Sequence, residues 1–263
     1  MFANERVNAL LAIIMLVVGG VACSMLRKKP PLTWHLTLEV EGAEADRPAA
    51  AKQTVAVIKK RLDAIGIARF EVAPVPRDRI VVVLPDTPDH ERLKRVVTAG
   101  GKLELTPVVS SVSPAPVEAY SLKQEAELMA FTKNGQVYPF EMPQTKQPAF
   151  LVLEKNAIVT GEDLRSANAV VKERPDHYSI VFSLRSEGAD RLGDWTKSHI
   201  NSYLAIVLNG TVVSAPYIRG EIRDTGEING NFSKTEAEDL ALVLTAGALP
   251  APIKLVEEKA GIF

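Results

Sequence analysis

Hydrophobic and polar residues alternate along residues 32–40, the first strongly patterned stretch after a long apolar segment. The apolar positions of this stretch, which share one side of an extended chain, are Leu32, Trp34, Leu36, Leu38 and Val40. Alternation of this kind predicts a strand with one buried face. The spacing then becomes helical over residues 55–65, and Gly66 stands where a helix would end.

Two more strands, a second helix and a last strand are predicted before residue 110. Residues 70–73 and 80–84 are strand-like, and the unbroken apolar run at 80–84 predicts burial on both faces of that strand. A helix over 87–99 and a strand over 103–109 follow. The order strand, helix, strand, strand, helix, strand predicts a ferredoxin-like base of the α+β class over residues 31–109.

Residues 110–149 differ in character because prolines and serines interrupt them. One helix is predicted near 117–131, and the segment as a whole is interpreted as a Pro-rich insertion or linker. A second α+β domain, the head, is predicted over residues 150–263. Its expected elements are a helix at 161–171, a strand at 178–184, a helix at 187–200 and a closing strand at 253–256.

The clearest local signals lie in the second half of the head. Two apolar runs flank Asn209-Gly210, the dipeptide that best fits the two positive-φ positions of a tight hairpin turn. Ser233 and Glu236 have the spacing of a capping box at the start of a helix. Gly247 marks the expected end of that helix. The sequence therefore predicts a hairpin that leads into a capped helix.

Residues 7–26 form a run of 20 uncharged residues, long enough to cross a membrane as a helix. Residues 1–30 are thus predicted to be an N-terminal membrane anchor. The small residues before Cys23 also fit a lipoprotein signal, in which Cys23 would be the lipidation site. A buried hydrophobic helix is the third interpretation.

Composition and charge exclude several classes. A net charge of -1 offers no general attraction to nucleic acid, and a single cysteine excludes a disulfide framework and argues against structural zinc. The four histidines lack metal-ligand spacing, and no nucleophile elbow or phosphate loop is present. We therefore predict no catalytic residue, no metal site, no cofactor and no enzymatic activity. Lys59-Lys60-Arg61 is interpreted as a solvated helix face, and Trp195 as a core residue.

Four stretches of the sequence, taken in order, resemble the large extracytoplasmic domain of the SecD family. They span residues 54–72, 79–105, 158–192 and 204–250. The resemblance extends over most of residues 36–258 and implies a base near the membrane with a head above it. The resemblance implies that the domain lies outside the cytoplasm. The basic residues at 27–29, directly after the apolar run, would instead favour keeping that end of the run in the cytoplasm.

The resemblance implies an accessory component of Sec-dependent protein export on the bacterial cell membrane. Its expected partners are components of the Sec translocon and unfolded exported polypeptides, with the membrane contacted through the N-terminal segment. The sequence runs to Phe263 without a second apolar span, which predicts that it lacks a proton-driven motor of its own. No polypeptide-binding residue is predicted. The alternative functions are an envelope scaffold or lipoprotein that binds a membrane-protein partner, and an enzyme with an unrecognised site.

Overall fold

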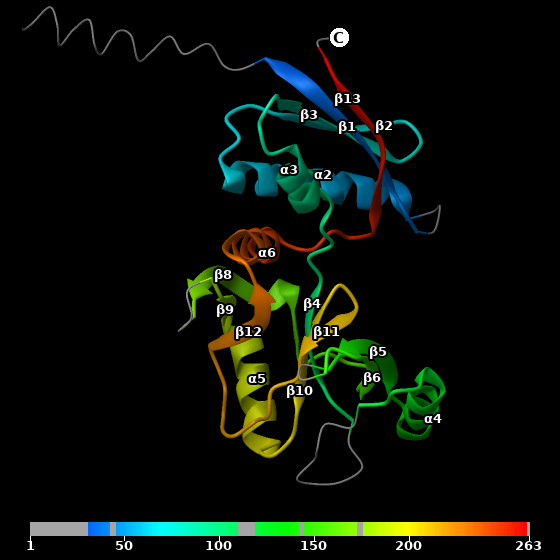
Figure 1. The fold of residues 1–263 in the computed structure, drawn as a ribbon, viewed down its shortest axis with the longest axis vertical. Coiled ribbons are helices and arrows are strands. Elements are labelled where there is room, and N and C mark those ends of the chain that lie inside the picture. Colours follow the sequence, from blue (N-terminus) through cyan, green and yellow to red (C-terminus); the bar gives the residue numbers. More distant parts are fainter. Residues whose placement is uncertain (1–30, 43–45, 110–118, 143–144, 173–175, 262–263) are drawn as a thin grey trace, which may run out of the picture.

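A computed structural model describes residues 31–42, 46–109, 119–142, 145–172 and 176–261. They form two lobes stacked along the long axis of the molecule (Figure 1). The predicted anchor at 1–30 and Cys23 lie outside the described residues. Within the described ranges, no helix is both long and apolar enough to cross a membrane.

The first lobe, which we call the base, is one antiparallel sheet with two helices on the face toward the other lobe (Figure 1). Its strands lie in the order β13-β1-β3-β2. In chain order its elements are β1 (Leu32–Val40), α2 (Arg47–Ile65), β2 (Glu71–Val75), β3 (Arg79–Pro85), α3 (His90–Thr98) and β13 (Ile253–Ala260). The predicted strand at 32–40 and the helix that ends before Gly66 are confirmed, and Gly66 takes the left-handed conformation that closes α2.

The prediction that residues 103–109 close the base sheet is wrong. That segment is β4 (Leu103–Pro107), which belongs to the other lobe, and β13 from the C-terminal end takes its place beside β1. The indole Nε1 of Trp34 donates to Glu258 across 3.0 Å, and Lys94 pairs with Glu258 across 3.1 Å. The other lobe is therefore inserted between α3 and β13. An apolar strand pattern predicts a strand but does not specify its partner.

The expectation that residues 80–84 are buried on both faces is also wrong. Ile80, Val82 and Leu84 are fully buried, whereas Val81 and Val83 remain partly exposed. Because α2 and α3 lie on one face of the sheet, only every second residue of β3 enters the core of the base.

The second lobe, which we call the head, contains a six-stranded mixed sheet and a three-stranded sheet. The strand orders are β6-β5-β11-β10-β4-β7 and β12-β9-β8. Besides β4, the elements are α4 (Lys123–Lys133), β5 (Gln136–Glu141), β6 (Pro148–Leu153), β7 (Val159–Thr160), η1 (Gly161–Asp163), β8 (Leu164–Val171), β9 (Tyr178–Leu184), α5 (Ser186–Ser198), β10 (Leu204–Leu208), β11 (Thr211–Ser214), β12 (Thr225–Phe232) and α6 (Lys234–Ala246). The largest core cluster of the head packs residues of both sheets against α5 and α6.

The interpretation of 110–149 as a linker is wrong for the residues that the structure describes. Helix α4 packs on the hairpin of β5 and β6, and this hairpin is part of the six-stranded sheet. Pro139 lies opposite Phe150 in that hairpin. The hairpin meets the rest of the sheet through the pair Val212 and Phe140, so it lies at a margin where prolines are tolerated.

The predicted helix at 161–171 is wrong as well. One turn of 3-10 helix leads into β8, which pairs antiparallel with β9. Tertiary pairing has overridden the local pattern here, and Val170 and Val171 favour the extended state. The predicted strand at 178–184 and the helix at 187–200 are confirmed as β9 and α5.

The hairpin and the capped helix are confirmed in detail. Asn209 and Gly210 both have positive φ, 50° and 80°, between β10 and β11. The hydroxyl of Ser233 accepts a hydrogen bond from the Glu236 amide across 3.3 Å, and the Glu236 carboxylate accepts one from the Ser233 amide across 2.9 Å. Local chemistry alone was sufficient to specify these two features.

Candidate functional site

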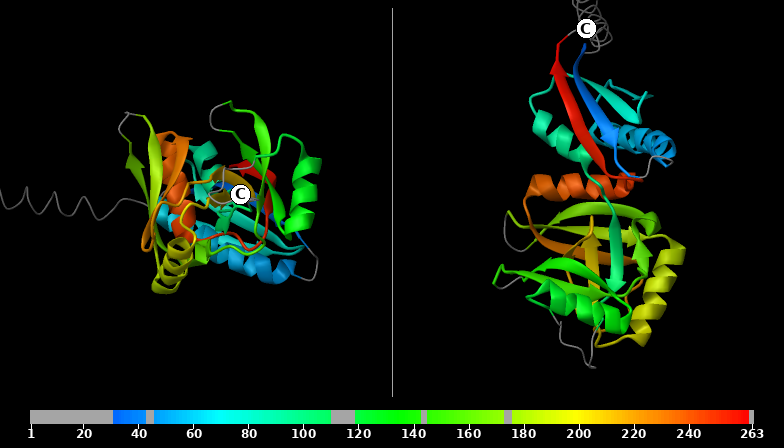
Figure 2. Two further views of the ribbon diagram at one scale, coloured as in Figure 1. Left: turned by 90° about the horizontal axis from the view of Figure 1, so that it is seen from below. Right: turned by 90° about the vertical axis from the view of Figure 1, so that its right-hand side faces the viewer.

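The chain crosses between base and head twice, at residues 99–102 and 247–252, and the two crossings touch. The amide of Leu249 donates to the carbonyl oxygen of Gly100 across 2.8 Å. Helix α6 lies between the base and the remainder of the head (Figure 2). Contacts at this junction therefore decide how the head is oriented on the base.

The side chain of Arg61, on α2, lies at the centre of the junction and is fully buried. Its Nη1 donates to the carbonyl oxygens of Ala99 and Val96, across 2.5 and 2.9 Å. Its Nη2 donates to the carbonyl oxygens of Gly247 and Gly100, across 3.0 and 3.4 Å. Burial lowers the pKa of Arg61 to about 10, so the guanidinium is still charged at neutral pH.

One buried guanidinium thus donates hydrogen bonds to carbonyl oxygens at the C-terminal ends of two helices. The last carbonyls of α3 and α6 have no partner inside their own helices and carry the negative end of each helix dipole. Among the described residues, no carboxylate pairs with Arg61, so these carbonyls supply the compensating charge. Helix α3 belongs to the base and α6 to the head, so the guanidinium joins the two lobes.

The sequence interpretation of Lys59-Lys60-Arg61 as a solvated face is wrong for Arg61. Lys59 and Lys60 are exposed, but Arg61 shares the buried side of α2 with Ile58 and Leu62. The signal that could have found it was its spacing of three residues from Ile58, on the apolar face of the predicted helix.

Close backbone packing holds the first crossing in place. A Cβ on Gly100 would lie 2.5 Å from Oδ1 of Asn209, and a Cβ on Gly101 would lie 2.7 Å from Cγ1 of Val243. The amide of Lys102 donates to Oδ1 of Asn209 across 3.0 Å, and the Asn209 amide donates to the Lys102 carbonyl across 2.9 Å. The predicted hairpin turn is therefore docked on the crossing.

A second interaction joins the lobes between α3 and α6. Nε of Arg92 lies 2.7 Å from Oδ1 of Asp239, and Arg95 lies 3.9 Å from the same carboxylate. The hydrogen bond that Arg92 donates to the Asp239 carboxylate raises the pKa of Arg92 above its ordinary value. The Asp239 side chain is only 12% exposed, so this pair is better shielded from salt than a surface pair.

A crevice of about 1110 Å³ opens between the two lobes beside the crossings. Helix α2 contributes Val57 and Lys60 to its lining, the first crossing contributes Lys102, and the head contributes Glu104 and Glu162. The second crossing and its flanks, residues 246–253, also line the crevice. The crevice therefore draws its walls from both lobes.

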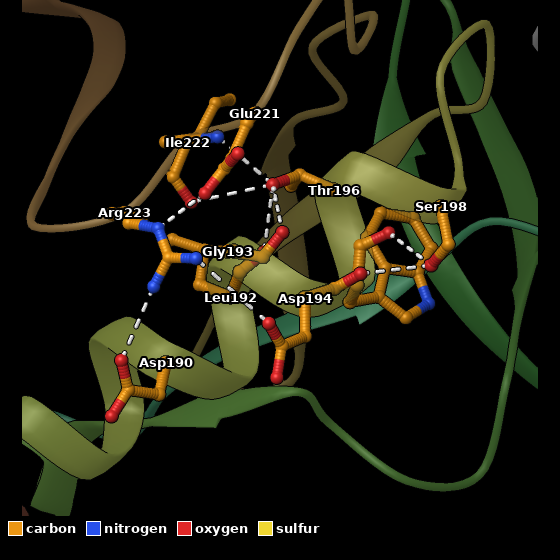
Figure 3. Close-up of polar contacts among 10 residues, drawn as sticks. Asp190, Leu192, Gly193, Asp194, Thr196, Ser198, Glu221, Ile222 and Arg223 are labelled. Atoms are coloured by element: carbon orange, nitrogen blue, oxygen red, sulfur yellow. Dashed lines mark hydrogen bonds and ion pairs between the residues drawn. The ribbon is translucent and has the colours of Figure 1, made fainter.

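Another polar cluster lies within the head, where α5 meets the loop before β12 (Figure 3). The buried hydroxyl of Thr196 accepts from the amide of Ile222 across 2.9 Å and donates to the carbonyl of Leu192 across 2.7 Å. Arg223 lies over Gly193 and pairs with Asp190 across 3.2 Å. Each polar group is satisfied by a structural neighbour, so this cluster anchors the loop.

Within the described ranges, no three His, Cys, Asp or Glu side chains are grouped so as to hold a metal ion. His90 stacks on Trp34 with ring centroids 4.1 Å apart, and His199 stacks on Trp195 at 4.4 Å. Trp195 is partly buried and packs against the head core. The prediction that the chain has no catalytic residue stays a prediction.

Comparison with known proteins identifies both lobes. Residues 51–110 match the family described as "Protein translocase subunit SecDF, P1 domain, N-terminal", and residues 135–251 match "SecDF, P1 head subdomain". Together the two matches cover about two thirds of the chain.

The chain is 36% identical over 208 residues to the protein translocase subunit SecD of Aquifex aeolicus, which covers 79% of this chain and 39% of that protein. It is 31% identical over 229 residues to SecD of Syntrophobacter fumaroxidans, with 85% of this chain and 41% of that protein covered. The chain thus spans about two fifths of the length of these curated relatives.

Solved structures of SecDF have the same fold. The structure titled "Structure and function of a membrane component SecDF that enhances protein export" superposes with a TM-score of 0.61 at 26% identity, over 85% of this chain and 98% of that one. The crystal structure of SecDF in its super-membrane-facing form gives a TM-score of 0.65 at 24% identity, over 97% of this chain and 35% of that one.

Fold and matches together define a two-lobed α+β domain of the kind found in protein translocase subunits. The chain belongs to the SecD family and carries the base and head of its P1 domain. The resemblance expected from the sequence is confirmed. The P1 domain of SecDF is periplasmic.

Proposed function

We propose that this chain acts in Sec-dependent protein export and binds translocating polypeptides on the outer side of the bacterial cell membrane. The observation that carries the proposal is the complete P1 architecture, with the head inserted between α3 and β13 of the base. A domain of this kind has to hold clients of many sequences. Binding that tolerates many sequences depends on shape, apolar surface and backbone hydrogen bonds.

Movement of the head on the base supplies the mechanical part of the proposed function. Two short crossings, at 99–102 and 247–252, connect the lobes, and several residues in them are glycine or proline. Arg61 and the Arg92 pair favour one orientation of the head. A change in the orientation of the head would break these contacts, form others, and change the affinity for a bound polypeptide.

The proposed partners are Sec translocon components and unfolded exported polypeptides. Contact with the membrane is assigned to the N-terminal segment at 1–30, either as a spanning helix or through lipidation of Cys23. Cysteine-to-alanine substitution separates these two cases. A lipid-anchored protein incorporates a labelled fatty acid and loses that label when Cys23 becomes alanine, whereas a helix-anchored protein carries no such label.

Deletion of the gene combined with pulse-chase labelling of secreted proteins tests the function. We expect slower maturation of several exported proteins, restored by the full-length chain. A photo-crosslinking residue at Lys197, exposed on α5, should capture exported chains of varied sequence in living cells. Unchanged secretion kinetics together with an absence of such adducts would contradict the proposal.

A fixed membrane-protein partner is the second candidate, and one surface favours it. Leu128 and Phe131 lie one turn apart on α4 and are 69% and 88% exposed. Exposed apolar side chains that group together are typical of interaction sites. A crosslinker at Phe131 that captures one folded protein, and no exported chains, would support the scaffold over the export function.

A further inference from the structure

The dipeptide Asn-Gly is a chemically labile pair, and the chain contains it three times, at Asn134-Gly135, Asn209-Gly210 and Asn229-Gly230. Asparagine is a thermolabile residue because its side-chain amide can be attacked by the backbone nitrogen of the next residue. Glycine in that next position lacks a Cβ, so its nitrogen approaches the asparagine side chain with the least obstruction. The surroundings of each pair therefore decide where this reaction can occur.

Two of the three pairs are enclosed by other parts of the head. The amide of Gly135 donates to the carbonyl oxygen of Ala130 across 2.8 Å, and a Cβ on Gly135 would lie 2.7 Å from Cγ1 of Val152. A Cβ on Gly230 would lie 2.4 Å from the ring of Phe232. Close packing of this kind resists the backbone movement that ring closure requires. Because it lies within the head, this packing does not depend on the contact with the base.

The third pair is open to solvent on one side and contacts the first crossing on the other. Asn209 and Gly210 are exposed, and a Cβ on Gly210 would meet no atom within 4 Å. Oδ1 of Asn209 accepts the hydrogen bond from the Lys102 amide across 3.0 Å, and it would lie 2.5 Å from a Cβ on Gly100. The Asn209 side chain is thus directed at the crossing. To bring its Cγ onto the Gly210 nitrogen, the side chain has to leave this contact.

We propose that Asn209 is a deamidation site, protected while the hairpin turn is docked on the first crossing and reactive when turn and crossing separate. In the reaction, the Gly210 amide loses its proton to a solvent base, and its nitrogen attacks Cγ of Asn209. The bond from Cγ to Nδ2 breaks, Nδ2 leaves as ammonia, and a cyclic succinimide remains. Water opens the ring at either carbonyl and gives aspartate or isoaspartate. One water is consumed and one ammonia released, with no oxidation or reduction.

The two products have different effects on the junction. Aspartate retains a side-chain oxygen for the Lys102 amide. Isoaspartate carries the backbone through Cγ and adds one carbon atom to a turn whose central residues, Asn209 and Gly210, have φ values of 50° and 80°. A turn with an extra backbone atom no longer fits the tight two-residue geometry, so it cannot dock on the crossing again. Isoaspartate at position 209 would therefore be a permanent record that the junction had opened.

Two glycine substitutions test the proposal as a matched pair. Gly100→Ala adds a Cβ where Oδ1 of Asn209 now lies and should displace the turn, whereas Gly220→Ala adds one at an exposed position with no atom within 4 Å. The full-length variants in detergent are incubated at mildly alkaline pH. Peptide mapping by mass spectrometry follows the conversion of each asparagine, and isoaspartyl methyltransferase labels the isoaspartate. We expect Asn209 to react about tenfold faster in G100A than in G220A, because the lost contact includes two hydrogen bonds to Lys102.

Asn134 and Asn229 serve as internal controls for folding. They should react as fast as Asn209 only in the urea-unfolded chain, and their rates should be the same in G100A and G220A. Equal rates at Asn209 in the two variants overturn the proposal. Equal rates at all three asparagines in G100A would show that this variant is unfolded. Arg61→Lys then replaces it, because it weakens the hydrogen bonding to Ala99 and Gly100 without adding an atom. An Asn209 rate in R61K that equals the parent's overturns the proposal, and a rise confined to Asn209 supports it.

Discussion

Nη2 of Arg61 lies 3.0 Å from the carbonyl oxygen of Gly247, although the two residues are 186 positions apart in the chain. The first belongs to the base and the second ends the helix α6 of the head. The same guanidinium also donates to the last carbonyls of α3. The orientation of the head therefore depends on a buried cation whose position was not visible in the charge pattern of the sequence.

Replacing Arg61 by methionine should destabilise the junction strongly. Methionine is similar in size but donates no hydrogen bond, so the carbonyl oxygens of Ala99 and Gly247 would remain buried without partners. We expect a loss of about 3 kcal/mol or more in the free energy of unfolding. Arg61→Lys keeps the charge but not the planar fork and should lose less. Urea denaturation of the purified chain measures both.

Lys60→Met is the matched control for Arg61→Met, because Lys60 is exposed on the same helix. Its effect should stay within about 0.5 kcal/mol. Spin labels on the base and the head would also report a broader distance distribution in Arg61→Met than in the control. Equal urea midpoints for the two methionine variants would show that the buried guanidinium does not join the lobes.

The Arg92–Asp239 pair should contribute a coupling energy between the lobes. A double-mutant cycle with Arg92→Met and Asp239→Asn is expected to give about 1 kcal/mol, more than the usual exposed pair because Asp239 is largely shielded. Raising the salt concentration should reduce this coupling only partly. Additive effects of the two substitutions would mean that the contact does not stabilise the junction.

Leu255 and Val256 test whether β13 is a strand of the base. Leu255 packs against the base core, whereas Val256 is 39% exposed. Leu255→Ala should lower stability by about 1–3 kcal/mol, since the side chain is only partly buried, and Val256→Ala by about 0.5 kcal/mol or less. Hydrogen exchange should accelerate in β1 of the Leu255 variant and remain unchanged in β10. Faster exchange in β10 instead would assign β13 to the head.

Local chemistry in the sequence predicted several elements, and tertiary partners account for the failures. Alternation predicted β1, and the turn at Asn209 and the cap at Ser233 required nothing beyond neighbouring residues. In contrast, strand partners are chosen by the whole fold, which is why β4 and β13 were assigned to the wrong lobes. The junction around Arg61 could not be predicted from the sequence for the same reason. Arg61 carries a charge, and only the two helix ends around it explain its burial.

Acid should weaken the head through Asp163, the last residue of the 3-10 turn η1 that connects β7 to β8. Burial alone would raise the pKa of Asp163, but hydrogen bonds from Arg191, at 2.6 Å, and from the amide of Thr160, at 2.9 Å, outweigh it and lower the pKa. The folded state therefore favours the carboxylate. The resulting stability is fully present above the unfolded pKa of about 3.9 and is lost as the pH falls through the lower, folded value.

Asp163→Asn measures this contribution directly, because asparagine carries no charge at any pH. The difference in Tm between the parent and the variant should be largest near neutral pH and should shrink as the solution is acidified below the unfolded pKa. Asp190→Asn is the control, since Asp190 is an exposed carboxylate on α5 that pairs with Arg223. A difference for Asp163→Asn that stays constant from neutral to acid would show that its hydrogen bonds stabilise the protonated and ionised carboxyl equally, and would contradict the assignment.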